Sequence, residues 1–190
     1  MIAETLLALS LQTSPIAATD SASMPSDAAT QARIEAADSK LFYAAFEGCT
    51  PEVLNDLMLP NYRMIHDQGG LVVNNRADFV ERITQGCADR APGAKNEGYR
   101  NRRLAVPGTR TIRRMGSWGV VENGDHVFFE LRRRPAGSLG KSDAGGPEWI
   151  MVGGASYTHV WQWMGDESRF RLSESISYDH GAALPYPPSE

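Results

Sequence analysis

The chain has 190 residues, of which 42% are hydrophobic and 22% charged, and its formal net charge is −4. This length corresponds to about one domain, long enough to bury a core without dense disulfides or structural metal, and the composition is that of an ordinary globular protein. No segment approaches the roughly 20 apolar residues that span a bilayer, so no membrane partner is expected.

The N-terminal segment resembles an export signal. Residues 1–18 (MIAETLLALSLQTSPIAA) contain an apolar run followed by small residues, although Glu4 stands where a basic start is usual. The alternative is a frayed tail. We predict a signal-like segment and linker over 1–27, one domain over 28–180 and a tail over 181–190. The expected location is the periplasm or the cell exterior, with the cytoplasm as the alternative.

Helical patterns come first in the folded part. Ile34, Ala37, Leu41 and Ala45 recur at helical spacing and predict a helix from about residue 26 to Gly48. A short second helix is predicted over 50–58, with Thr50 as its cap, and a third over 75–87, capped by Asn75. Between these two, residues 61–74 (NYRMIHDQGGLVVN) predict two short strands around a glycine turn.

The rest of the chain has strand patterns at 98–106, 109–122, 125–134, 148–164 and 169–180. Asn123-Gly124 predicts a hairpin between the second and third of these, and residues 136–148 a long hairpin loop. Helices followed by strands indicate an α+β fold. We expect three N-terminal helices packed in a strongly curved mixed or antiparallel sheet, a cone with an internal pocket.

Nine arginines lie between Arg100 and Arg134, opposed there by only three acidic residues. Such a segment is a candidate surface for an anion or nucleic acid. However, no aromatic residues are interleaved for base stacking, and the chain as a whole is acidic. We therefore expect these arginines on the solvated faces and ends of strands, and no nucleic-acid partner.

Several segments together resemble a known family: LFYAAFEGCTPEVLNDLM (41–58), MIHDQGGLVV (64–73), ADFVERI (77–83), SYTHVWQW (156–163) and LSESISYDH (172–180). Their order and spacing over about residues 30–180 are similar to the nuclear-transport-factor-2-like superfamily, and most to its SnoaL-like branch of bacterial domains of unknown function. The resemblance implies the cone fold. It does not imply one function, because members include isomerases, dehydratases, cyclases and hydrolases, while others bind or dimerise.

The two cysteines, Cys49 and Cys87, have two interpretations. They form a structural disulfide in an exported protein, or they pack as two buried thiols. The related subgroup has a similar cysteine pair in comparable places, and this resemblance favours the disulfide. Their spacing is not that of a redox-active Cys-x-x-Cys pair.

His66 and Asp67 are adjacent, and side chains alternate along a strand. His66 therefore shares a face with Tyr62 and Met64, whereas Asp67 shares the other face with Ile65. We predict that the two residues are not a catalytic dyad and that Asp67 is a turn residue bonding to nearby backbone N–H groups.

His159 shares a face with Tyr157, Trp161 and Trp163, the more apolar side of its strand. It is either a satisfied core residue or a general base in a pocket. Glu174 alternates with Leu172 and Ile176. It is either a pocket carboxylate with a raised pKa or, if the serine-rich face is the inner one, a residue that is exposed or at a dimer interface.

The sequence supports three hypotheses about function. The first is a small-molecule-binding protein for a small apolar ligand, with six candidate ligand-binding residues: Tyr62, Met64, His66, Tyr157, His159 and Trp161. The second is a cofactor-independent isomerase, lyase or hydrolase, with His66, His159, Glu174 and Tyr62 as catalytic candidates. The third is an association module, a homodimer through the sheet, with Trp161 and Trp163 as anchors.

No nucleotide fingerprint, phosphate loop or local metal-binding motif occurs, so neither a cofactor nor a metal is expected. The enzyme hypothesis predicts that His66 or His159 lines an apolar cavity within reach of another polar group. The association hypothesis predicts a large exposed apolar patch on the sheet.

Overall fold

The computed structural model describes residues 22–133, 147–182 and 186. Its helical part begins with α1 (Asp27–Phe42), which continues as a π-helical turn, η1 (Tyr43–Glu47). A 3-10 turn, η2 (Pro51–Val53), leads into α2 (Leu54–Leu57), and α3 spans Arg76–Ala88. As predicted, Asn75 caps α3, because its side-chain oxygen accepts the Asp78 N–H at 2.9 Å. No helix in these ranges is long and apolar enough to cross a membrane.

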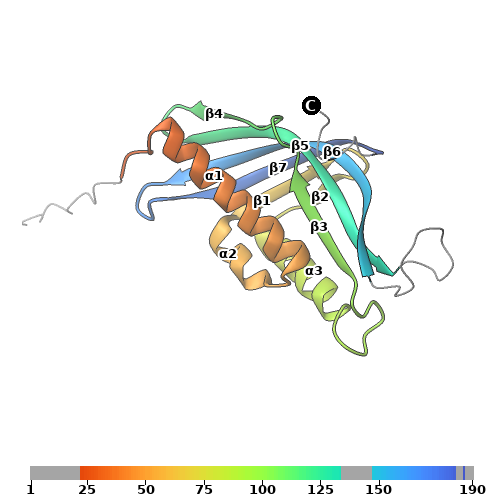
Figure 1. The fold of residues 1–190 in the computed structure, drawn as a ribbon. Coiled ribbons are helices and arrows are strands. Elements are labelled where there is room, and N and C mark those ends of the chain that lie inside the picture. Colours follow the sequence, from red (N-terminus) through yellow and green to blue (C-terminus); the bar gives the residue numbers. More distant parts are fainter. Residues whose placement is uncertain (1–21, 134–146, 183–185, 187–190) are drawn as a thin grey trace, which may run out of the picture.

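Seven strands in the described ranges form one sheet: β1 (Met58–His66), β2 (Gly70–Val73), β3 (Arg100–Ala105), β4 (Thr111–Met115), β5 (Gly119–Arg133), β6 (Pro147–Met164) and β7 (Arg169–Gly181). The order is β2-β1-β7-β6-β5-β3, with β4 also paired to β5. Only β1 and β7 pair in parallel. The helices lie together on one side of the curved sheet (Figure 1). This arrangement confirms the predicted α+β class.

The core lies between α1 and the inner face of the sheet. Ile34 and Leu41 of α1 are almost fully buried, as are Trp161 on β6 and Leu172 on β7. Burial alternates strictly over residues 155–163 of β6, so that Ala155, Tyr157, His159, Trp161 and Trp163 all point inward. The predicted common face of His159 and the aromatic residues is therefore correct.

The predicted hairpin at Asn123-Gly124 is wrong. Strand β5 runs through these residues without a break, and Asn123 pairs with Thr111 on one side and Thr158 on the other. The turn lies earlier, between Met115 and Gly119, where Gly116 has a φ of 58°. Gly124 has a different role: a Cβ atom there would lie 2.9 Å from the Tyr157 hydroxyl. Its missing side chain makes room for the Tyr157 ring.

Cys49 and Cys87 form a disulfide, with their Cα atoms 5.6 Å apart. The bond joins the segment after η1 to the end of α3. Arg90 supports the same junction, since its guanidinium donates to the Phe46 carbonyl at 2.8 Å and to Asn101 Oδ1 on β3 at 3.0 Å. Closing a loop of 38 residues stabilises the fold by about 4 kcal/mol in the chain-entropy account.

Three predicted segments fall wholly or largely outside the described residues: the signal-like stretch over 1–18, the loop over 136–148 and the tail over 181–190. The described chain begins in contact with the sheet. Ala22 donates its N–H to the Gly165 carbonyl at 3.2 Å, and its own carbonyl accepts from Trp163 Nε1 at 2.8 Å.

Candidate functional site

An apolar cavity of about 250 Å³ lies inside the cone. It is lined by residues of α1, η1, α3 and four strands: Leu41, Phe42, Phe46, Tyr62, Met64, His66, Phe79, His126, Phe128, His159, Ser175, Ser177 and His180. The wall is mostly aliphatic and aromatic, with a few histidines and serines. Such a wall is typical of small-molecule sites, in which a few polar groups orient an apolar ligand.

Four of the six candidate ligand-binding residues line this cavity. Tyr62, Met64 and His66 do so from β1 at alternate positions, and His159 does so from β6. Burial raises the pKa of Tyr62 to about 12, so its phenol stays protonated. The proximity of His66 and His159 to one apolar cavity, with other polar groups beside each, agrees with the enzyme hypothesis.

The other two candidates, Tyr157 and Trp161, lie behind the cavity. The Tyr157 hydroxyl donates to Glu122 Oε1 at 3.0 Å, and Trp161 Nε1 donates to Glu122 Oε2 at 2.8 Å. Burial, and then the nearby Glu122 charge, raise the pKa of Tyr157 to about 12. Trp161 is 0% exposed and Trp163 is 9% exposed, so the prediction that they anchor an interface is wrong.

Glu174 lies on the outer face of the sheet. Its carboxylate bonds to Arg63 at 2.6 Å, and it does not line the cavity. The cause is a bulge in β7: Trp161 pairs with Leu172 and Val160 with Glu174, so Ser173 has no register partner on β6. The alternation shifts by one residue at this point. The serine-rich face of β7 is therefore the inner one here, with Ser175 and Ser177 pointing inward. Glu174 is not a pocket carboxylate.

Asp67 lies at the rim of the cavity and has a partner from the far end of the chain. Its Oδ1 accepts from His180 Nδ1 at 2.8 Å, and its Oδ2 accepts the His180 backbone N–H at 3.1 Å. His66 Nδ1 lies 3.1 Å from the same Oδ1 and accepts the Gln68 N–H at 3.2 Å. The main role of Asp67 is therefore to hold His180 against β1, beyond the predicted role in the turn.

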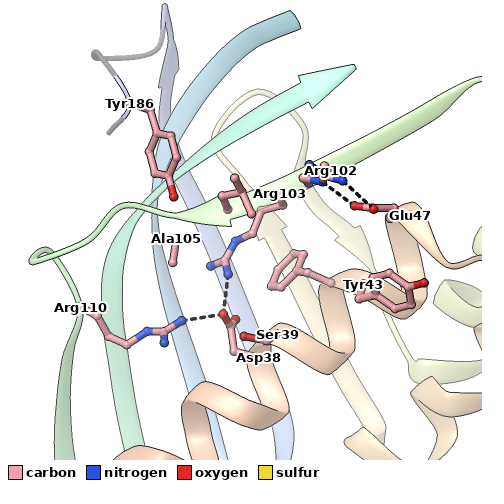
Figure 2. A pocket seen from close by; sticks show the side chains of 11 residues that line it. Asp38, Ser39, Tyr43, Glu47, Arg102, Arg103, Ala105, Arg110 and Tyr186 are labelled. Carbon is pink, nitrogen blue, oxygen red and sulfur yellow. Dashed lines mark hydrogen bonds and ion pairs between the residues drawn. The ribbon is translucent and has the colours of Figure 1, made fainter. Parts of the chain in front are cut away.

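A buried ionic cluster, here defined as Asp38, Arg103, Arg110, Glu122 and His159, stands behind the cavity. Asp38 Oδ2 accepts from Arg103 at 2.5 Å and from Arg110 at 2.7 Å, and Arg110 Nε lies 2.9 Å from Glu122 Oε1. Figure 2 shows both guanidinium groups directed at Asp38 on α1. Burial raises the pKa of Asp38, but the charges of Arg103 and its neighbours lower it by more.

The ionic cluster explains part of the arginine-rich segment. Arg103 is 7% exposed, and its guanidinium is stacked between Phe42 and Tyr157. Arg102, in contrast, forms two bonds with Glu47 at the surface, in a groove of about 440 Å³ that Figure 2 shows from close by. The expectation that these arginines all lie on solvated faces is wrong for Arg103.

His159 lies beside two buried carboxylates. Its Nδ1 lies 3.5 Å from Asp38 Oδ1 and 3.5 Å from Glu122 Oε2. Burial lowers the pKa of His159, but its interactions with Asp38 and Glu122 raise it by more, so the net shift is upward. The two carboxylates thus stabilise the protonated form of His159 relative to a histidine in water.

His126 is held in the opposite state. Burial, and then the positive charge of Arg103, lower its pKa to about 2, so the ring is neutral. Its Nδ1 accepts from Arg103 Nε at 3.0 Å, which assigns the single ring proton to Nε2. This N–H is buried and has no partner among the described residues. A donor in this condition is costly unless a water or a ligand accepts from it.

Among the described residues, two groups have a geometry compatible with a metal: His66, Asp67 and His180 at the rim, and Asp38, Glu122 and His159 in the ionic cluster. In the ionic cluster, Arg103 and Arg110 already neutralise the carboxylates, and Trp161 and Tyr157 bond to Glu122. The cationic role is thus filled by arginine.

Asp38, Glu122 and His126 were not predicted as site residues, although each stands at a position whose periodicity indicates burial. Asp38 follows Ile34 by four residues and precedes Leu41 by three, so it lies on the buried stripe of α1. Glu122 and His126 share the inward parity of Val120 on β5. A charged residue at an apolar periodic position is the pattern that identifies such a cluster.

No family model matches the chain, and no curated protein is similar to it in sequence. Solved structures do match its fold. A nuclear transport factor 2 (NTF2-like) superfamily protein from Salmonella enterica is 14% identical with a TM-score of 0.55, over 83% of this chain and 94% of that one. A Catenulispora acidiphila structure in complex with S-DNPA is 14% identical with a TM-score of 0.56, over 80% and 95%.

A hub homology domain also matches. The CamKII hub homology domain of Chlamydomonas reinhardtii is 16% identical with a TM-score of 0.53, over 77% of this chain and 94% of that one. The chain therefore has the nuclear-transport-factor-2-like fold, which confirms the resemblance at the level of fold. These neighbours include a ligand complex and a hub homology domain, so the fold alone does not define the function.

Proposed function

We propose that this chain binds a small, mostly apolar molecule that carries a hydrogen-bond-accepting oxygen. One observation carries the proposal: the apolar cavity is bounded by His126, whose buried Nε2–H has no partner among the described residues. The cavity volume of about 250 Å³ suits a one- or two-ring ligand. The S-DNPA complex of a Catenulispora acidiphila protein supports the use of this fold for small molecules.

In this proposal the apolar wall and the polar groups have separate tasks. Leu41, Phe46, Met64 and Phe79 remove the body of the ligand from water, which supplies most of the affinity. His126 donates to the ligand oxygen and so selects its orientation. The hydrogen bond adds about 1 kcal/mol, and more where the alternative is a buried donor without a partner.

The test uses two ligands of nearly equal shape, 2-acetylnaphthalene and 2-ethylnaphthalene, measured by saturation-transfer NMR. We expect the ketone to bind about tenfold more tightly, because only its carbonyl accepts from His126. In His126→Phe the ratio of affinities is expected to fall to about one. Equal affinities in the unmodified protein would contradict the role of His126, and no binding of either ligand would contradict the site.

A second candidate is acid–base catalysis on the bound molecule, as in a cofactor-independent isomerase, lyase or hydrolase. It is favoured by the upward pKa shift of His159, which lines the cavity with two carboxylates behind it. An imidazolium held in this way can protonate a ligand oxygen as charge develops on it.

The homodimer through the sheet stays a prediction. Val121, Val160 and Ile176 provide partly buried apolar surface on the outer face of its central strands. Export is likewise proposed on the basis of the disulfide, because such bonds persist in oxidising compartments.

A further inference from the structure

A serine, a histidine and an aspartate form a hydrogen-bonded series at the rim of the cavity. Ser177 Oγ lies 3.2 Å from His180 Nε2, and His180 Nδ1 lies 2.8 Å from Asp67 Oδ1. Each ring nitrogen of His180 thus faces one of the two other side chains. This is the connectivity that converts a serine hydroxyl into a nucleophile.

The parallel pairing of β1 with β7 brings these residues together. His66 is the register partner of Ser177, and the next residue, Asp67, donates its N–H to the Ser177 carbonyl at 3.0 Å. Asp179 has a φ of 57°, in the left-handed region, and this turn directs the His180 ring back toward Ser177. A residue other than glycine in this region costs about 1–3 kcal/mol, and such strain is frequent at functional sites.

The hydrogen bonds also assign the proton on His180. The Asp67 carboxylate accepts from Nδ1–H, so in the neutral ring Nε2 carries the lone pair and accepts the Ser177 hydroxyl proton. The His180 backbone N–H bonds to the other Asp67 oxygen, and this bond is the first cause that lowers the pKa of Asp67. Asp67 therefore stays ionised and holds the tautomer that a general base needs.

The same contacts argue against a metal at this place. Both Asp67 oxygens accept from His180, and His66 Nδ1 accepts the Gln68 N–H. Each of these atoms, which could otherwise ligate a cation, thus already has a hydrogen-bond partner. This pattern favours the hydrogen-bonded series over metal ligation.

We propose that Ser177 is the nucleophile of a second activity of this chain, the hydrolysis of esters with a small apolar acyl group, with His180 as base and Asp67 as its positioning residue. Ser177 is 5% exposed and lines the apolar cavity, which is where the acyl group would lie. His66 stacks on His180 with ring centroids 3.9 Å apart. This places a second imidazole beside the proposed base, with its Nδ1 3.1 Å from Asp67 Oδ1 and 3.2 Å from the Gln68 backbone nitrogen.

The reaction needs only water as co-reactant. Ser177 Oγ attacks the ester carbonyl while its proton passes to His180 Nε2. The bond to the alkoxy group then breaks, and His180 protonates the departing alcohol. Water next attacks the acyl-serine, His180 accepts its proton, and release of the carboxylic acid returns the proton to Ser177. This inference uses the cavity as space for the acyl group but does not depend on the ligand oxygen proposed to bind His126.

The test treats the full chain with diisopropyl fluorophosphate and measures its intact mass and peptide map. We expect one diisopropylphosphoryl group, on Ser177, with loss of fluoride. Ser177→Ala should abolish both the adduct and the hydrolysis of p-nitrophenyl butyrate. Ser156→Ala is the matched control, since Ser156 donates to Asp125 at 2.7 Å but belongs to no such series. It should keep the adduct.

The variant Asp67→Asn tests whether Asp67 positions His180 for catalysis or only stabilises the fold. It should lower kcat by about a thousandfold or more with KM little changed, because the amide favours the wrong His180 tautomer. An unlabelled protein, an adduct that persists in Ser177→Ala, or hydrolysis abolished by EDTA would each overturn the proposal. Binding of 2-acetylnaphthalene by Ser177→Ala tests the cavity separately. If this variant binds the ketone while the unmodified protein shows no adduct, the ligand site stands and the esterase proposal fails.

Discussion

At the scale of single residues, His126 and His159 show how the environment sets a protonation state. Both line the same cavity. Burial, and then the Arg103 guanidinium, lower the pKa of His126 to about 2, whereas the two carboxylates beside His159 outweigh its burial and raise its pKa. The cavity wall therefore combines a neutral imidazole with one whose protonated form is stabilised by its neighbours.

The neutral state of His126 predicts a pH dependence of stability. Below about pH 6.5 the unfolded chain protonates this histidine and the folded chain does not, down to about pH 2. The free energy of unfolding should thus fall with decreasing pH by up to about 1.4 kcal/mol per unit from this residue. Urea unfolding at about pH 5 and about pH 6 should show a smaller fall in His126→Phe than in the unmodified protein.

The titrations of His159 and Asp38, two neighbours of His126, do not change the expected loss of stability between about pH 6 and about pH 5. The pKa of His159 is raised, so below about pH 6.5 it is protonated in both states, and its stabilisation is lost only at higher pH. The pKa of Asp38 is lowered, so its stabilisation is lost only below about pH 4. Equal pH slopes in both proteins would show that His126 does not stay neutral on folding.

At the scale of elements, β5 and β7 decide which side chains reach the cavity. The bulge at Ser173 turns Glu174 outward and Ser175 and Ser177 inward. The uninterrupted course of β5 places Glu122 and His126 on the inner face together. Gly124 between them is what allows Tyr157 of β6 to lie against β5.

Gly124→Ala tests this close approach. The added Cβ would meet the Tyr157 hydroxyl at 2.9 Å and displace it from Glu122. We expect a loss of about 1–3 kcal/mol in the free energy of unfolding, measured with urea. Gly86→Ala in α3 is the matched control: its Cβ would meet only Arg90, at 3.9 Å, and should stabilise the helix by up to about 1 kcal/mol. If both variants were equally stable, Gly124 would have no packing role.

At the scale of the whole molecule, the disulfide joins the helical layer at a point where Arg90 also contacts β3. Its removal should lower stability without removing the cavity, since neither cysteine lines it. We expect the double variant Cys49→Ala with Cys87→Ala to lose about 2–4 kcal/mol in urea unfolding.

The control is the unmodified protein with dithiothreitol, which should lose a similar amount, while the double variant should not respond to the reductant. An unmodified protein of unchanged stability under reduction, with free thiols verified by mass, would contradict a structural role for the bond.

The sequence by itself determined the elements whose signals are local. Helical spacing from Ile34 to Ala45, the Asn75 cap and the alternation from Tyr157 to Trp163 all depend on neighbours a few residues away, and each is present in the structure. The order of these elements predicted the α+β class, and the resemblance of five segments to a known family implied the nuclear-transport-factor-2-like fold. The disulfide followed from the resemblance together with two cysteines.

Only the tertiary structure decided the site. The Asn123-Gly124 signal was overridden because β4 and β6 pair with β5 on both sides of it. The β7 bulge, which selects Ser177 over Glu174, depends on register with β6. Asp67 and His180 are separated by 113 residues and meet only because β1 and β7 pair in parallel. Such long-range pairings have no local signature, since their free energy comes from the assembled sheet rather than from any one segment.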